Sequence, residues 1–263
     1  MALTEQIKTR SLKKNRVIAR LDIKGPNLIK GVSFEGLRVI GSPIDYAEKY
    51  YLDGIDELIY IDTVATLYGR NNLLELVKKV GEKVFIPITV GGGIRTVDDA
   101  RNFLNAGADK VGINTAAVNN PKILKEISSR FGNQCVVLII DAKKIRDNYW
   151  EVFTENGREK TGKNVIDWAK EANTLGIGEI LLTSIDKDGT LNGPDIDLVN
   201  NIKKVIDVPL IVSGGIGKIS HIENLFSKTK NYNLALGTAL HKKIIKIEEI
   251  KKFLKLNNFQ INR

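Results

Sequence analysis

The sequence contains little cysteine, methionine, histidine or proline: its 263 residues include one Cys, one Met, two His and six Pro. The single cysteine, Cys135, excludes an internal disulfide framework and fits a reducing compartment, so a cytoplasmic location is expected. It opens the apolar run CVVLIID, which predicts a buried, unreactive thiol. His221 and His241 lie in helical context without carboxylates at metal-ligand spacing, so we expect both at the surface and predict no metal and no cofactor.

Long hydrophobic runs are also missing. No apolar stretch approaches the roughly 18–20 residues that a membrane span needs, and the amino-terminal stretch MALTEQIKTRSLKKNR lacks the apolar centre of a signal peptide. The net charge is +9, but glutamates interrupt the lysines and no aromatic-rich basic segment occurs. We therefore expect no membrane and no nucleic-acid partner, while the charge is compatible with anionic small molecules.

Eight short apolar runs recur along the chain, and most are continuously apolar, as strands buried on both faces are. They are RVIARLDI, ELIYID, VFIPITV, KVGIN, CVVLIID, EILLTSI, VPLIVS and NLALGT. Amphipathic stretches separate them and begin with helix-capping residues such as Ser42 and Thr96. Eight strand–helix units in about 250 residues predict an α/β fold, a single (β/α)8 TIM barrel over residues 16–263 after an extension over residues 1–15. A doubly wound sheet is the alternative.

The chain also repeats internally. GIDELIYID at Gly54 matches GIGEILLTS at Gly176, and IPITVGGGI at Ile86 matches VPLIVSGGI at Val208, both at an offset of 122 residues. A repeat of this kind predicts two similar half-barrels of four units each.

The matching stretches LDIK and IDAK place Asp22 and Asp141 at the ends of the first and fifth strands, opposite each other in a closed barrel. Residues at the carboxyl ends of barrel strands face the active site. Two carboxylates across one pocket can act as general acid and general base if their environments separate their pKa values. A duplicated aspartate that caps the following helix is the alternative, but the symmetric pair, each followed two residues on by a lysine, favours catalysis.

Glycine-rich segments follow four strands as two symmetric pairs. They are VGGGIR (90–95) with GINTAA (112–117), and VSGGIGK (212–218) with LGTAL (236–240). Glycine lets backbone N–H groups approach an anion, and Asn114 and Thr115 add side-chain donors. Tight turns also use glycine, so one glycine cluster alone would be weak evidence for a phosphate site. Two clusters half a barrel apart predict a substrate with a phosphate at each end, its middle between the two aspartates.

A polar loop, TSIDKDGTLNGPD (183–195), follows the sixth strand and carries an Asp-Gly turn signal. It is either an ordinary surface loop or a binding segment in which Thr183 and Asp188 contact substrate hydroxyls and Gly189 donates a backbone N–H. Its position at the rim favours binding. The chain has no Ser–His or Cys–His nucleophile arrangement and no dinucleotide-binding fingerprint.

From about Arg16 to Leu256 the sequence resembles the cyclase (synthase) subunit of imidazole glycerol phosphate synthase. The matching stretches are RVIARLDIK, DELIYID, TVGGGI, ADKVGINTAAV, IDAK, GEILLTSIDKDGT and SGGIGK. The sister isomerase of histidine biosynthesis shares the repeat and the aspartates, but ADKVGINTAA and GEILLTSIDKDGT are much more similar to the cyclase. The resemblance implies a lyase in which ammonia from a glutaminase partner attacks a ribulosyl-formimino aminoimidazole carboxamide bisphosphate (PRFAR). The products would be imidazole glycerol phosphate and aminoimidazole carboxamide ribotide (AICAR).

The resemblance also implies residue roles. Asp141 would be the general base and Asp22 the general acid, assisted by Lys30 on a mobile first loop. Residues that would hold one phosphate are Gly93, Asn114 and Thr115. Residues that would hold the other are Gly189, Gly215, Gly237 and Thr238, with Thr183 and Asp188 binding substrate hydroxyls or the ring.

The family has a charged gate for ammonia at the other end of the barrel, and Arg16, Glu57, Lys110 and Glu179 match it. Each stands at the start of a strand, where an apolar residue would otherwise be expected. The four could instead form a purely stabilising ion-pair network. Asp109, beside this ring, is expected to face the glutaminase subunit of a heterodimer.

Two departures from the family lie near the expected site. Arg20 replaces a usual Cys, and Gly25-Pro26-Asn27 replaces a usual Asp-Gly-Arg in the first loop. The alternative function is therefore a paralogue that channels ammonia to sugar amidation in surface-polysaccharide biosynthesis. A third possibility is a non-catalytic scaffold that activates a glutaminase, against which the intact aspartates and phosphate sites argue.

Overall fold

The computed structural model describes residues 15–65, 73–227 and 232–259, so most of the expected amino-terminal extension lies outside the described residues. Within them, eight parallel strands pair in a closed ring, because the last strand pairs with the first. In ring order they are β1 (Val17–Lys24), β4 (Glu57–Asp62), β5 (Ile88–Gly91), β6 (Lys110–Ile113), β7 (Val136–Arg146), β10 (Glu179–Ser184), β11 (Leu210–Ser213) and β12 (Asn233–Leu236). The predicted TIM barrel is confirmed, and each of the eight apolar runs contributes one of its strands.

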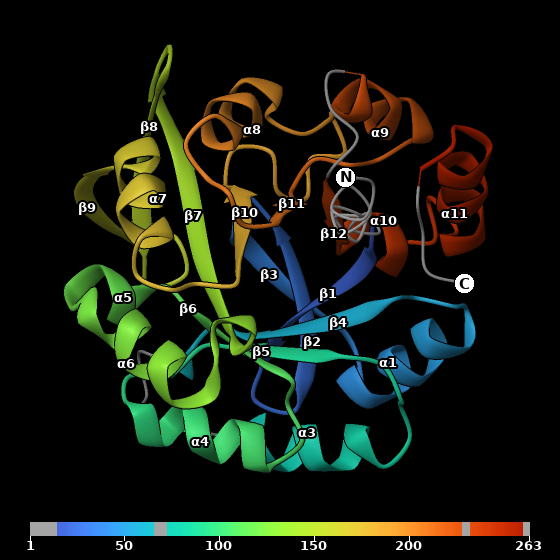
Figure 1. Cartoon of the computed structure of the whole chain (residues 1–263). Helices are drawn as coiled ribbons and strands as arrows, with labels where there is room; N and C mark the ends of the chain where they lie inside the picture. The colour runs from blue at the N-terminus through green and yellow to red at the C-terminus, as the bar shows by residue number, and fades with distance from the viewer. Residues whose placement is uncertain (1–14, 66–72, 228–231, 260–263) are drawn as a thin grey trace, which may run out of the picture.

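Helices surround the strands on the outside of the barrel (Figure 1). They are α1 (Pro43–Leu52), α3 (Leu73–Gly81), α4 (Val97–Asn105), α5 (Thr115–Asn119), α6 (Lys122–Phe131), α7 (Val165–Asn173), α8 (Ile196–Lys203), α9 (Ile219–Phe226), α10 (Thr238–His241) and α11 (Ile247–Leu256). The predicted caps are in place: Ser42 accepts the Asp45 N–H, and Thr96 forms a capping box with Asp99.

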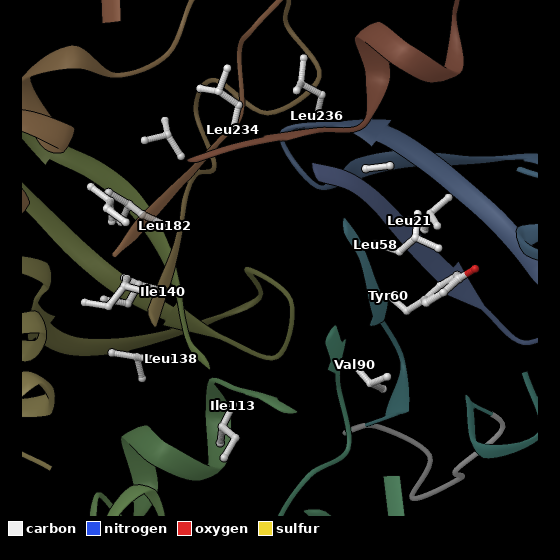
Figure 2. Packing of buried hydrophobic residues seen from close by; sticks show 14 of the residues in the cluster. Leu21, Leu58, Tyr60, Val90, Ile113, Leu138, Ile140, Leu182, Leu234 and Leu236 are labelled. Carbon is white, nitrogen blue, oxygen red and sulfur yellow. The ribbon is translucent and has the colours of Figure 1, made fainter. Parts of the chain in front are cut away.

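Two separate apolar clusters hold the barrel together. The larger lies between strands and helices, and residues from strands all round the barrel contribute to it, among them Leu21, Val90 and Ile140 (Figure 2). The smaller consists of Ile18, Ile59, Ile61, Val137, Ile139, Leu181, Ile211 and Ala235. Because successive side chains of a strand point to opposite faces, this second set fills the inside of the barrel.

Two antiparallel hairpins, which the sequence analysis did not predict, extend the first strand of each half. β1 continues through the Gly25–Pro26 turn into β2 (Asn27–Val32) and then β3 (Glu35–Gly41). β7 continues in the same way into β8 (Tyr149–Thr154) and β9 (Glu159–Asn164). The twofold repeat therefore includes the hairpins as well as the barrel.

Two expectations from the sequence were wrong. His241 is 6% exposed and its Nδ1 lies 2.6 Å from the Tyr50 hydroxyl, because the short helix α10 packs against α1 instead of facing solvent. Cys135 ends a short 3₁₀ helix (Asn133–Cys135) before β7 and is only partly buried. Burial still raises the pKa of its thiol. Among the described residues, no helix is long and apolar enough to cross a membrane.

Candidate functional site

Along β1 the inward-facing residues are Ile18, Arg20 and Asp22, and Arg16, directly before the strand, continues the alternation toward the other end of the barrel. Asp22 and Asp141 lie near the carboxyl ends of the parallel ladders of β1 and β7, and each is 5% exposed. Four strand-to-strand steps separate β1 from β7 in either direction round the ring, so the two strands are opposite, as predicted.

Asp22 is held by two cations. Its Oδ1 accepts a hydrogen bond from Arg20 Nε and its Oδ2 accepts one from Lys30 Nζ, both at 2.8 Å. Burial alone would raise the pKa of Asp22, but Arg20 and Lys30 outweigh it and hold that pKa well below its usual range. Lys30 comes from β2 and also bonds both oxygens of Asp188, at 2.8 and 3.1 Å. These two carboxylates raise the pKa of Lys30 against the lowering effect of burial.

Asp141 has a different environment. Its Oδ2 accepts one hydrogen bond, from Asn114 Nδ2 at 3.0 Å, and its buried Oδ1 has no partner among the described residues. Burial raises the pKa of Asp141 to about 6, although Arg20 and the Asn114 hydrogen bond oppose the shift. A carboxyl group with a pKa near neutrality and an oxygen that accepts no hydrogen bond from the described residues is suited to exchanging a proton.

Asp141 borders a cavity of about 350 Å³ at the mouth of the barrel. The cavity is also lined by Gly93, Asn114 and Thr115, the residues predicted for one phosphate. Residues there that the sequence analysis did not single out include Asp62, Arg95 and Glu155. Glu155 lies in the β8–β9 turn, donates its N–H to Thr115 Oγ1 at 3.2 Å and has a buried Oε2 without a partner among the described residues.

The residues predicted for the other phosphate line a second, much smaller hollow of about 10 Å³. They are Gly189, Gly215, Gly237 and Thr238, together with Asp188. The Oγ1 atom of Thr238 is buried there and has no partner among the described residues. Thr183 is fully buried and accepts a hydrogen bond from Arg20 Nη1 at 2.7 Å, instead of lining either cavity.

The β2–β3 hairpin explains why the second hollow is small. The Ser33 N–H donates to the Asp188 carbonyl at 2.9 Å, so the hairpin rests on the β10–α8 loop. Gly189 has a φ of +74°, and a Cβ there would lie 2.5 Å from the Gly31 carbonyl oxygen. Phe34 at the hairpin tip reaches the other hairpin, since a Cβ on Gly157 would lie 2.7 Å from the Phe34 ring. The two hairpins therefore meet over the mouth.

At the other end of the barrel the four predicted gate residues form a closed ring of alternating charges. Arg16 bonds Glu57 and Glu179, each at 2.5 Å, and Lys110 bonds the same two glutamates, each at 3.1 Å. The exposed Asp109 lies beside the ring, and its Oδ2 accepts the Ile88 N–H at 2.8 Å. The interior apolar cluster separates this ring from the mouth.

Arg20 and Ser213 complete the mouth, and the sequence analysis assigned a role to neither. A signal for Arg20 was present, because a charged residue interrupts an apolar run two positions before Asp22 and so shares its inward face. Glu155 had no such signal, since it lies in a turn of a hairpin that was not predicted.

A family model described as "Histidine biosynthesis protein" matches residues 16–246. The "Imidazole glycerol phosphate synthase subunit HisF" of Legionella pneumophila is 62% identical over 204 residues, which cover 78% of this chain and 96% of the relative. The subunit of the same name from Streptococcus mutans is 44% identical over 248 residues, covering 94% of this chain and 99% of the relative. That from Clostridium botulinum (strain Okra) is 42% identical over 247 residues, covering 94% and 98%. The matched region includes both aspartates and both cavities, and the chain belongs to the histidine biosynthesis protein family.

Proposed function

We propose that this chain catalyses the cyclase reaction of imidazole glycerol phosphate synthase in histidine biosynthesis. Ammonia and PRFAR would be converted into imidazole glycerol phosphate and AICAR, which makes the chain a carbon–nitrogen lyase. The names of relatives at 42–62% identity support this activity. No observation favours sugar amidation in polysaccharide biosynthesis.

The observation that carries the proposal is the arrangement of the mouth. Glycine-rich loops with hydroxyl and amide side chains line two hollows, one bordered by Asp141 and the other by Asp188. Lys30 bonds both Asp188 and Asp22, so it links Asp22 to the edge of the second hollow. An elongated substrate with a phosphate at each end would therefore lie across the barrel with its reacting centre over the aspartates.

Asp141 is the general base in this proposal. Its pKa of about 6 leaves it deprotonated at neutral pH, and its Oδ1, which has no partner in the described part of the chain, can accept a proton. The acid role that the resemblance implies for Asp22 stays a prediction, and the geometry argues against it because both oxygens already accept hydrogen bonds from cations. Lys30, which is protonated and bonds both Asp22 and Asp188, is the nearest alternative donor.

A glutaminase subunit is the proposed source of ammonia. The relatives are named as subunits, and the ring of Arg16, Glu57, Lys110 and Glu179 closes the end of the barrel opposite the mouth. A partner docked over this ring would contact the exposed Asp109. The cytoplasmic location stays a prediction from the cysteine content.

The test supplies purified chain with PRFAR and an ammonium salt and follows both products by chromatography. Turnover without any partner supports the proposal, because ammonium replaces the glutaminase. A folded chain, shown by circular dichroism, that releases neither product would contradict it. Mixing the chain with a glutaminase subunit from the same organism and replacing ammonium by glutamine then tests the partnership.

A further inference from the structure

Arg20 crosses the inside of the barrel. Its side chain is 3% exposed and belongs to the inward face of β1, one inward position before Asp22. Nε donates to Asp22 Oδ1 at 2.8 Å, and Nη1 donates to Thr183 Oγ1 at 2.7 Å, with Ser213 Oγ at 3.4 Å. One guanidinium therefore connects the aspartate on β1 with side chains on β10 and β11.

The hairpin covers this guanidinium. The Phe34 ring centroid lies 5.4 Å from Arg20 Cζ, which is the distance of a cation–π contact. The remaining terminal nitrogen, Nη2, has no hydrogen-bond partner among the described residues. Removing a cation from water costs free energy, and Arg20 offsets this cost through the partners that it meets at the mouth, Asp22, Thr183 and Phe34.

We propose that Arg20 is a positioning residue of the reaction centre: with Lys30 it fixes Asp22 as a carboxylate whose two oxygens both accept hydrogen bonds, and its guanidinium links Asp22 to Thr183, so that of the two aspartates Asp141 exchanges the proton with the substrate. The inference rests on the proposed function. Its basis is geometric, since each oxygen of Asp22 faces a cation, whereas Oδ1 of Asp141 faces none.

Other charged groups face the two aspartates and also influence their pKa values. On the Asp22 side they are Lys30 from β2, Asp188 from the β10–α8 loop and His241 from α10. On the Asp141 side, Asp62, Arg95 and Glu155 line the shared cavity. Arg20 influences both aspartates: it lowers the pKa of Asp22 and that of Asp141.

The test compares Arg20→Met, Arg20→Lys and the exposed control Arg130→Met in the ammonium-fed reaction from pH 5 to 9. Arg20→Met removes the charge, so the acid limb of kcat/KM moves to higher pH and kcat falls by about a hundredfold through lost alignment. Arg20→Lys keeps the charge but not the planar fork, so kcat falls while the limb stays near that of the wild type. Arg130→Met matches the wild type. If the acid limb of the kcat/KM profile stays at the same pH in Arg20→Met, the proposal is overturned, because the loss of a merely structural residue would lower kcat without shifting the profile.

A second readout does not depend on turnover. Aspartate ¹³C-carboxyl NMR of the substrate-free wild-type chain follows both groups, assigned by their loss in Asp22→Asn and Asp141→Asn. We expect Asp141 to titrate near pH 6 and Asp22 to stay ionised from pH 4 to 8. If Asp22 titrates in this range, the inference is wrong. If NMR gives the expected result but PRFAR is not converted, Asp22 is a fixed carboxylate as inferred and the proposed function fails.

Discussion

At the scale of single residues, two aspartates at repeat-related positions have opposite electrostatics. In the matched stretches, Arg20 of β1 corresponds to Ile139 of β7, so the cation two residues before Asp22 has no counterpart before Asp141. That one difference, together with Lys30, explains why the pKa of Asp22 is lowered while that of Asp141 rises to about 6.

Asp141→Asn is the direct test of the base. We expect kcat to fall by roughly 10²–10⁴-fold with KM almost unchanged, because the amide keeps the shape of the side chain but cannot accept a proton. In the wild type, kcat/KM should fall about tenfold per pH unit below pH 6, since protonation of Asp141 removes the base. Steady-state kinetics checks both statements. A variant that retains wild-type turnover would refute the assignment.

The repeat in the sequence predicted where these aspartates lie, but not their ionisation. Their position follows from strand order, which the apolar runs and the offset of 122 residues indicate. Their pKa values depend on Lys30, which reaches Asp22 from a strand that was not predicted, and on Asn114, whose side chain only the fold brings beside Asp141.

At the scale of elements, the β2–β3 and β8–β9 hairpins, in addition to the loops between strands and helices, form the mouth of the barrel. The Gly25–Pro26 turn joins β1 to β2, and Gly25 has a φ of +58°, as a two-residue hairpin loop with glycine first requires. The sequence showed the turn, but β2 and β3 are only partly buried, so they lack the continuous apolar pattern that indicated the barrel strands. The replacement of the family's usual Asp-Gly-Arg is thus a change of turn chemistry beside Lys30.

Gly25→Ala tests the importance of this turn. A Cβ at Gly25 would contact nothing within 4 Å, so the cost is the positive φ alone, about 1–2 kcal/mol. Gly54→Ala, after α1, has the same open surroundings at a φ of +83° and serves as the control. Denaturant unfolding should show similar losses for both variants, whereas kcat should fall only in Gly25→Ala, because only this turn positions Lys30. Equal kcat values in the two variants would separate the hairpin from catalysis.

At the scale of the whole molecule, charge is concentrated at the two ends of an apolar interior. The ring of Arg16, Glu57, Lys110 and Glu179 is neutral overall, and its side chains are 7–14% exposed. Lys110→Met leaves Glu57 and Glu179 to share Arg16, and breaking a buried ion pair costs about 3–5 kcal/mol. Chemical unfolding measures this loss. Lys78→Met, which breaks an exposed pair with Glu75, should cost less than about 1 kcal/mol; equal losses would mean that the ring adds no stability.

The two sets of residues predicted to hold a phosphate, one beside each hollow, predict that the chain binds the two products independently. Imidazole glycerol phosphate and AICAR carry one phosphate each, so each should occupy a different side of the barrel. At 100 times its Kd, one product stabilises the fold by about 2.7 kcal/mol, a rise in Tm of about 5–10 °C, and two independent sites should add. Thr115 and Thr238 line one hollow each, so Thr115→Val and Thr238→Val should each weaken the binding of a different product. Thermal melting with each product alone and with both measures these shifts. If the two products compete, or if both variants lose the same one, a bisphosphate does not span the barrel.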